Sequence, residues 1–348
     1  MSTDFLLVDN WSDNFLNSFD HLAGKLKFLF LAQRFIGLFS LLFGLSIAIQ
    51  QQNFKKFDLS FTNYYFKRAI ILAIIGIIQI LFFFMGDILL IYSLLSVLLF
   101  FLFRLSNKVL ITVSILTFFI PAFLESIGSC RSYISDFSEN IENHYTANGI
   151  IQAYQTGTLF QMMKARLTEY FYFDLTGVMW NRTSFALMIV GYLIGRNNLH
   201  INYLSYWNKL KIALGFCLFC YLAFIVYFLA AEIQFGFWIN MADNLHILFS
   251  IATYLLLILF IYKHNLLKRF SSLIMNVGKM SLSNYLLQAI VCSFIFTNYG
   301  LHLFSMTTPT DNLLIAITIY IAQVVFSYFY LRKFKTGPLE LAWRRLAY

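Results

Sequence analysis

The sequence predicts an all-α fold: a polytopic bundle of about nine transmembrane helices, with the N-terminus outside and the C-terminus in the cytoplasm. Two observations predict the bundle. Of the 348 residues, 60% are hydrophobic and only 12% are charged, whereas about a quarter of the residues of a soluble domain are charged. The apolar residues also gather in runs of about 20, which is the length a helix needs to cross a bilayer. A third observation, the placement of Lys and Arg, gives the orientation.

The apolar runs follow one another closely along the chain, with one long interruption in the middle. They cover 28–50, 69–86, 87–104, 108–128, 177–195, 210–235, 243–262, 280–299 and 312–331. Because open strands cannot cross lipid, each run predicts a helix. The second and third runs meet at Met85, Gly86 and Asp87, which predicts a very tight turn.

The basic residues lie on alternate connections. Most of the 25 Lys and Arg fall in 51–68, 104–108, 196–211, 263–279 and the C-terminal tail. The intervening connections are acidic instead, with Asp87, Glu232, Asp243 and Asp311. Positive charge marks the cytoplasmic side of short loops. An odd number of helices then places the N-terminus outside, and residues 1–24, which hold Asp but no Lys or Arg, agree with that.

Three segments follow from this topology. We expect an extracytoplasmic N-terminal segment at 1–27 and a transmembrane bundle at 28–333. A cytoplasmic amphipathic tail follows at 334–348, where Glu340 and Arg344 are spaced as an i, i+4 pair. The bundle contains one extracytoplasmic loop, 129–176, and the apolar spacing over 150–172 predicts an amphipathic helix on its outer surface.

Several classes of function are excluded. The net charge of +9 does not indicate a nucleic-acid partner, because the basic residues sit at helix ends and not in a soluble patch. Cys217 and Cys220 form a C-x-x-C spacing in mid-helix with no second ligand pair, so we predict no metal site. The motifs H-E-x-x-H, G-x-S-x-G, Walker and Rossmann do not occur. The partner that composition does indicate is the lipid bilayer.

Four stretches resemble one known family. They are 278–288 (GKMSLSNYLLQ), the tail 334–340 (FKTGPLE) followed by Trp343 and Arg344, the turn 86–89 (GDIL) with Tyr92, and Arg34 with the apolar run after it. Tyr154, Gly157 and Arg166 also fit the family's loop pattern. In this order, over 34–348, the chain resembles the YeiB-like family of bacterial inner-membrane proteins, a domain of unknown function.

The resemblance has implications and two departures. The family is similar to transmembrane acyltransferases such as the lysosomal heparan glucosaminide acetyltransferase. It implies a multi-pass protein of the bacterial plasma (inner) membrane that moves an acyl group from cytoplasmic acetyl-CoA or another acyl-CoA to an extracytoplasmic small-molecule or glycan acceptor, with no permanently bound cofactor. This chain lacks the family's usual first helix, and it has Gln79 where the family has His. A non-catalytic membrane subunit, or a transporter of lipid or a small molecule, stays open as an alternative.

Two residues are candidates for the catalytic site. Asp87 could deprotonate an acceptor hydroxyl, or it could only cap a helix. Gln79 precedes Asp87 by one to two turns and takes the place of the family's His. An amide cannot be a general base, and the alternative for Gln79 is an interhelical hydrogen bond.

The candidates for substrate binding are Arg34, Arg166, Arg182, Asn284, Tyr285 and Gln288. Arg34 lies inside the first apolar run, where it either binds an anionic group or extends to the membrane surface. Arg182 has the same two alternatives at the interface. Asn284 and Gln288 share a helix face and could bind the donor or join neighbouring helices. His246 and His302 stand alone in the sequence, so we expect each to be structural.

Overall fold

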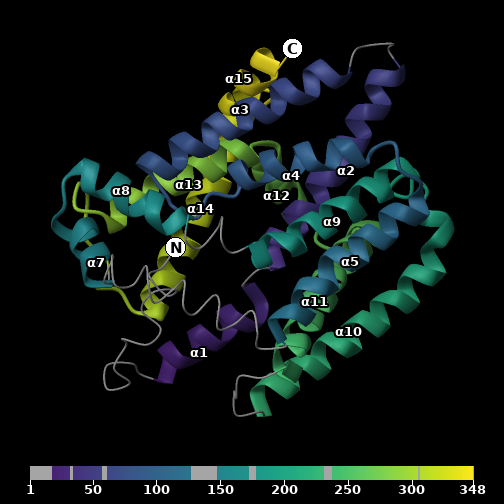
Figure 1. The fold of residues 1–348 in the computed structure, drawn as a ribbon, viewed down its shortest axis with the longest axis horizontal. Coiled ribbons are helices and arrows are strands. Elements are labelled where there is room, and N and C mark those ends of the chain that lie inside the picture. Colours follow the sequence, from purple (N-terminus) through teal and green to yellow (C-terminus); the bar gives the residue numbers. More distant parts are fainter. Residues whose placement is uncertain are drawn as a thin grey trace.

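The computed structural model describes residues 18–31, 34–56, 61–126, 147–171, 178–230, 237–304 and 306–347 (Figure 1). Within these ranges the chain is helical and contains no strand, which confirms the all-α prediction. Glu232, Cys130 and much of the predicted loop 129–176 lie outside the described residues. The side chain of Arg182 also lies outside them, although its backbone belongs to a described helix.

The helices follow the chain in this order: α1 (Ser18–Leu26), the π-helical turn η3 (Lys27–Leu31), α2 (Arg34–Lys56), α3 (Phe61–Phe82), α4 (Leu89–Leu102), α5 (Asn107–Ser126), α7 (Ala147–Thr156), α8 (Leu159–Tyr170), α9 (Val178–Arg196), the 3₁₀ turn η5 (Tyr203–Tyr206), α10 (Trp207–Ala230), α11 (Phe237–Lys263), α12 (Lys268–Lys279), α13 (Ser281–Phe296), α14 (Pro309–Lys333) and α15 (Pro338–Ala347).

Five stretches of the described chain are long and apolar enough to cross a membrane: Phe19–Phe54, Phe61–Phe82, Tyr203–Leu229, Ala242–Lys263 and Pro309–Lys333. A sixth is possible if α12 and α13, which meet at an angle of 80°, count as one span. Shorter apolar helices cover Leu89–Leu102, Asn107–Ile120 and Thr183–Arg196. Each of the nine apolar runs overlaps one of these helices. The number nine and the sides of the two termini stay predictions.

The outer surface of the bundle is apolar. On α10, which forms one edge of the molecule (Figure 1), the exposed fractions are 74% for Ile212, 71% for Phe219 and 65% for Val226. Soluble proteins rarely expose a continuous apolar surface of this kind. Together with the spans, this surface identifies the chain as an integral membrane protein.

The helices α2 and α9 form the closest seam of the bundle. A Cβ atom added to Gly44 would lie 1.9 Å from the carbonyl oxygen of Met188, and one added to Gly191 would lie 1.9 Å from that of Leu41. The backbones therefore touch directly, as small residues allow in membrane helices. On its other side α9 packs against α5, where the Ser114 hydroxyl donates to the Ala186 carbonyl at 3.0 Å.

The helix expected over 150–172 is two helices, α7 and α8, so the prediction of a single helix is wrong. They separate at Gly157 and Thr158. The Thr158 backbone N–H donates to Gln161 Oε1 at 2.7 Å, and the Thr158 hydroxyl accepts from the Gln161 backbone N–H at 3.3 Å, which is a capping box that starts a new helix. Helix α8 packs against α3 and buries residues such as Met162 and Ala165.

The tail forms the predicted helix, α15, but Glu340 has a different partner from the expected Arg344. Its Oε1 accepts from the backbone N–H groups of Leu282 at 2.8 Å and Ser283 at 3.1 Å. These belong to the first turn of α13, whose free N–H groups favour a negative charge. Glu340 therefore joins the tail to the bundle.

Candidate functional site

The turn between α3 and α4 holds the Asp87 carboxylate in the interior, with no exposed surface. Its Oδ2 accepts from the Leu90 backbone N–H at 2.9 Å, so Asp87 caps the first turn of α4. Gly76 on α3 provides the space, since a Cβ there would lie 2.5 Å from Asp87 Oδ2. The expected turn and the expected cap are both present.

Tyr285 reaches this carboxylate from α13. Its hydroxyl donates to Asp87 Oδ1 at 3.1 Å and accepts from the Ile88 backbone N–H at 3.2 Å. The contact joins positions 198 residues apart. Two of the predicted site residues are thus brought together, one from each half of the chain.

Gln79 completes this cluster from the buried face of α3. It has no exposed surface, and in the described part of the chain neither its Nε2 nor its Oε1 has a hydrogen-bond partner. The amide lies close to the Tyr285 hydroxyl without reaching hydrogen-bond geometry. An unpaired amide in a membrane interior is costly, so Gln79 has hydrogen-bonding capacity left for a ligand. The interhelical hydrogen bond weighed for it does not form among these residues.

Arg166 belongs to α8, and its side chain, which is 1% exposed, reaches the C-terminal end of α3. Its Nη1 donates to the Leu81 carbonyl, and its Nη2 donates to the hydroxyls of Ser293 and Tyr299, each at 3.2 Å. A cation at this place satisfies the free carbonyls of α3 and favours its dipole. These contacts tie α8 to α3 and α13.

Glu169, three residues beyond Arg166 on α8, was not among the predicted residues. It is 2% exposed, and the Tyr154 hydroxyl donates to its Oε2 at 2.5 Å. Burial raises the pKa of Glu169 to about 7, against the opposing effects of Tyr154 and Arg166. The i, i+3 spacing from Arg166 was the available signal in the sequence.

Arg34 belongs to a second cluster, between α2 and α11. It is 1% exposed, so extension to the membrane surface is wrong for this side chain. Its Nη2 donates to His246 Nδ1 at 2.6 Å. Because arginine can only donate, Nδ1 must accept, and the neutral ring then carries its proton on Nε2. His246, expected to be a lone structural residue, is thus paired with a predicted site residue.

The remaining candidates divide in two. Asn284 joins helices: its Nδ2 donates to the Ser327 hydroxyl on α14 at 3.0 Å, and its backbone carbonyl accepts from the Gln323 side chain at 2.8 Å. Gln288 is half-buried and makes no side-chain hydrogen bond within the described ranges. In the same ranges no group of His, Cys, Asp and Glu is arranged to hold a metal ion.

Comparison with known proteins finds similarity to the same family as the motifs do. Residues 192–348 match the family described as "Protein of unknown function (DUF418)". Over 355 aligned positions, 98% of this chain and 84% of the relative, the chain is 26% identical to the "Uncharacterized protein YxaH" of Bacillus subtilis (strain 168). It is 41% identical to the "Uncharacterized protein YeiB" of Escherichia coli (strain K12) over 70 residues. The resemblance to the YeiB-like family is confirmed.

The matches differ in extent. The YeiB match covers 20% of this chain and 18% of that relative. A third relative, the "Uncharacterized 39.9 kDa protein in amylase 3'region" of Bacillus acidopullulyticus, is 33% identical over 23% of each chain. No solved structure matches the chain significantly. The DUF418 match contains Tyr285 but not Asp87, whereas the longer similarity to YxaH extends over almost the whole chain.

Proposed function

We propose that this protein is a transmembrane acyltransferase of the bacterial plasma (inner) membrane. It would move an acyl group from a cytoplasmic thioester, acetyl-CoA or another acyl-CoA, to the hydroxyl of an extracytoplasmic small molecule or glycan. The observation that carries the proposal is the buried cluster of Asp87, Tyr285 and Gln79. Burying polar side chains inside a membrane bundle costs free energy, and such residues usually belong to a functional site. This cluster combines a carboxylate with an unpaired amide.

The cluster suggests a division of roles. The Asp87 oxygens accept hydrogen bonds from Leu90 and Tyr285, and a carboxylate has about four lone pairs, so it can also accept from an incoming hydroxyl. Asp87 would take the hydroxyl proton while the acceptor oxygen bonds to the thioester carbonyl carbon. The carbon–sulfur bond then breaks, and the proton passes to the departing thiolate. Tyr285 would hold the carboxylate in place, and the Gln79 amide would donate to the carbonyl oxygen.

The other predicted residues support this site at a distance. In the predicted topology Arg34, Arg166 and Arg182 lie toward the outside, where cations would suit an anionic acceptor. Asn284 and Gln288, on the helix that carries Tyr285, would position the donor. Arg166 and Asn284 already make contacts between helices, so these two would act on the substrates through the helices that they hold in place.

Gln79 specifically favours a second candidate, a non-catalytic membrane subunit. An amide can bind a ligand but cannot remove a proton at neutral pH. A chain that keeps the Asp87–Tyr285 pair and has Gln at this position could bind an acyl or glycan group without transferring it. The acyltransferase would transfer the acyl group repeatedly, whereas the non-catalytic subunit would only bind its ligand.

The test is a transfer assay on purified protein in nanodiscs with radiolabelled acetyl-CoA. Asp87→Asn should lower the rate by roughly 100-fold or more, the usual effect of losing a general base. Tyr285→Phe should lower it less. Asp311→Asn is the matched control, because Asp311 also caps a helix and is exposed at the predicted outer side.

The outcomes separate the candidates. Equal rates for Asp87→Asn and Asp311→Asn would contradict the assigned role of Asp87. Absence of both acetyl-CoA binding at millimolar concentration and transfer would contradict the enzyme. Gln79→His tests the position directly: a higher rate shows that the amide at position 79 limits transfer, and an unchanged rate shows that Gln79 does not limit it.

A further inference from the structure

A further polar site, apart from the two clusters described above, lies near the N-terminal end of α3, at Arg68. The sequence presents Arg68 as one of several basic residues on the connection 51–68, but its side chain is only 6% exposed. Its Nη1 donates to Gln50 Oε1 on α2. Its Cζ lies 5.1 Å from the centre of the Phe43 ring and 4.7 Å from that of Trp343 on α15. The guanidinium is thus enclosed by three helices.

Two hydrogen-bond donors at this place have no acceptor. Arg68 Nε and Trp343 Nε1 are both buried and unpaired in the described part of the chain, and no carboxylate there forms an ion pair with Arg68. A buried cation without a counter-charge is strongly unfavourable. The cation–π contacts offset only part of that cost. Among the described residues, Arg68 therefore has no counter-charge, and both donors remain available to an anion.

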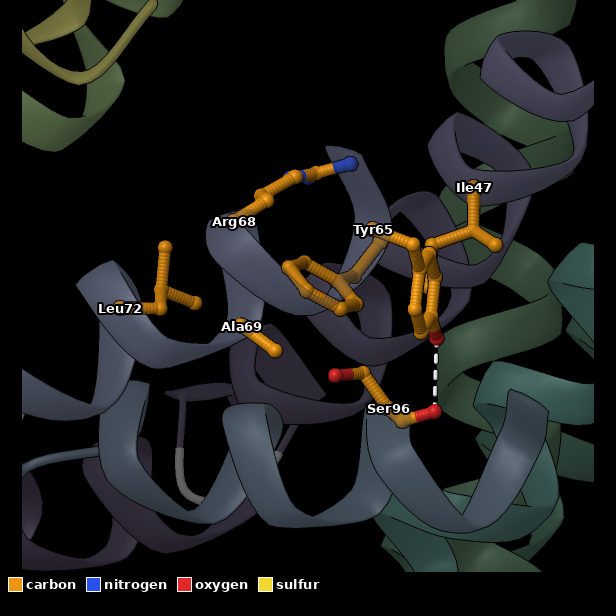
Figure 2. A pocket seen from close by; sticks show the side chains of 7 residues that line it. Ile47, Tyr65, Arg68, Ala69, Leu72 and Ser96 are labelled. Atoms are coloured by element: carbon orange, nitrogen blue, oxygen red, sulfur yellow. Dashed lines mark hydrogen bonds between the residues drawn. The ribbon is translucent and has the colours of Figure 1, made fainter. Parts of the chain in front are cut away.

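A small cavity opens beside Arg68 (Figure 2). It has a volume of about 10 Å³ and is lined by Phe43, Ile47, Tyr65, Arg68, Ala69, Leu72 and Ser96. That is room for about one water molecule. The Tyr65 hydroxyl donates to the Ser96 carbonyl at 2.6 Å, so this hydroxyl is already engaged. Arg68 is the only charged side chain of this lining. A group larger than a water molecule would bind outside the cavity, against the guanidinium.

We propose that Arg68, together with Trp343 packed against its guanidinium, binds the phosphate group of a phosphate ester beside this cavity. The planar guanidinium matches phosphate with two parallel donors, and the indole N–H can donate to a further oxygen. Three exposed basic residues adjoin these two in the chain: Lys67 on α3, and Arg344 and Arg345 on α15. Their charges add positive potential that attracts such an anion. The phosphate can come from a soluble ester such as CoA or from a phospholipid headgroup.

The site does not depend on acyl transfer, although it is compatible with it. Arg68 and Gln79 are both on the buried face of α3, and eleven residues of helix separate their Cα atoms by about 16 Å. If the ester is CoA, its phosphate would bind at the predicted cytoplasmic end while its arm points along α3 toward Asp87. Phosphate binding without transfer would leave this inference intact and contradict only the enzyme.

The experiment uses the full chain and the fluorescence of Trp343, taken as the difference between the wild-type protein and Trp343→Phe. One arm titrates the protein in a neutral detergent with CoA and with inorganic phosphate. The other titrates it with mixed micelles containing phosphatidylglycerol. A saturable signal in the first arm identifies a soluble ester, and a signal in the second alone identifies a headgroup. No saturable signal in either arm overturns the proposal.

Variants make the assignment specific. Arg68→Gln should weaken binding at least 10-fold, because it removes charge-assisted hydrogen bonds from a buried place. Lys67→Gln, which removes an exposed charge from the adjacent position, should change the affinity by less than about twofold. Equal effects of the two would indicate general surface charge and contradict the site. Arg68→Lys keeps the charge without the planar group, so it should weaken binding several-fold even if Arg68→Gln does not fold.

Discussion

At the scale of single residues, the Glu169 carboxyl shows how burial shifts a proton equilibrium in this protein. It lies on α8, outside the spanning helices, and its pKa is raised to about 7. The folded protein therefore binds a proton that the unfolded chain, with an ordinary pKa near 4.5, releases. Protonated Glu169 can remain buried, whereas the charged form must be stabilised by Arg166 and Tyr154.

This gives a prediction about pH. The contribution of Glu169 to stability is full below about pH 4.5 and is lost as the pH rises through about 7. We expect the unfolding temperature of the protein in detergent to fall over this range. Glu169→Gln, which mimics the neutral form, should reduce that slope, and a variant with an unchanged slope would show that another group titrates. The measurement is thermal unfolding at several pH values between 5 and 8.

The residues of the candidate site were predictable to different degrees. Asp87 and Tyr285 are predictable as site residues because they stand in motifs that resemble a family. Their contact is not predictable, because the two residues are 198 positions apart in the sequence. Arg68 looked like an ordinary cytoplasmic anchor, since spacing cannot show that Trp343 would cover it. Glu169 was missed because its burial depends on how α8 packs.

At the scale of elements, direct backbone contact defines the α2–α9 seam. We predict that Gly191→Ala destabilises the protein by about 1–3 kcal/mol, since the new methyl group would overlap the Leu41 carbonyl and force the helices apart. Gly215→Ala is the control, because nothing lies within 4 Å of the added carbon on α10. It should be neutral or slightly stabilising. Unfolding in increasing denaturant measures both, and equal midpoints would contradict the seam.

Helix boundaries were less predictable than the helices themselves. The run expected from residue 69 begins at Phe61, because aromatic rings cover Arg68 and allow a charge within the buried face. The break between α7 and α8 was visible as a Thr158–Gln161 capping box, but the apolar spacing across it favoured one helix. Apolar run length identifies a span well, while caps and ring contacts decide where it starts.

At the scale of the whole molecule, the predicted topology can be tested with a native cysteine. Cys130 lies in the predicted extracytoplasmic loop 129–176, whereas Cys217, Cys220 and Cys292 lie within helices. A membrane-impermeant maleimide should label Cys130 in cells whose inner membrane is intact and whose outer envelope has been permeabilised. Tyr348→Cys in a Cys130→Ser background should be labelled only after the inner membrane is permeabilised. The reverse order would invert the assigned orientation.

Low charge content and long apolar runs were together sufficient to predict an all-α membrane bundle. The arrangement of the helices was beyond them. The pairing of α2 with α9 depends on which glycines face each other across the bundle, and no periodicity in one helix specifies its partner.

The α2–α9 seam also restricts how this protein can move. The main chains of these two helices touch at Gly44 and Gly191. The helices cannot slide past one another without a clash between backbone atoms, so we expect them to move as one rigid body. Helix α10 has no such glycine contact at Gly215 and faces outward over most of its length. A cycle that exposes the interior first to one side of the membrane and then to the other would therefore have to move α2 and α9 together.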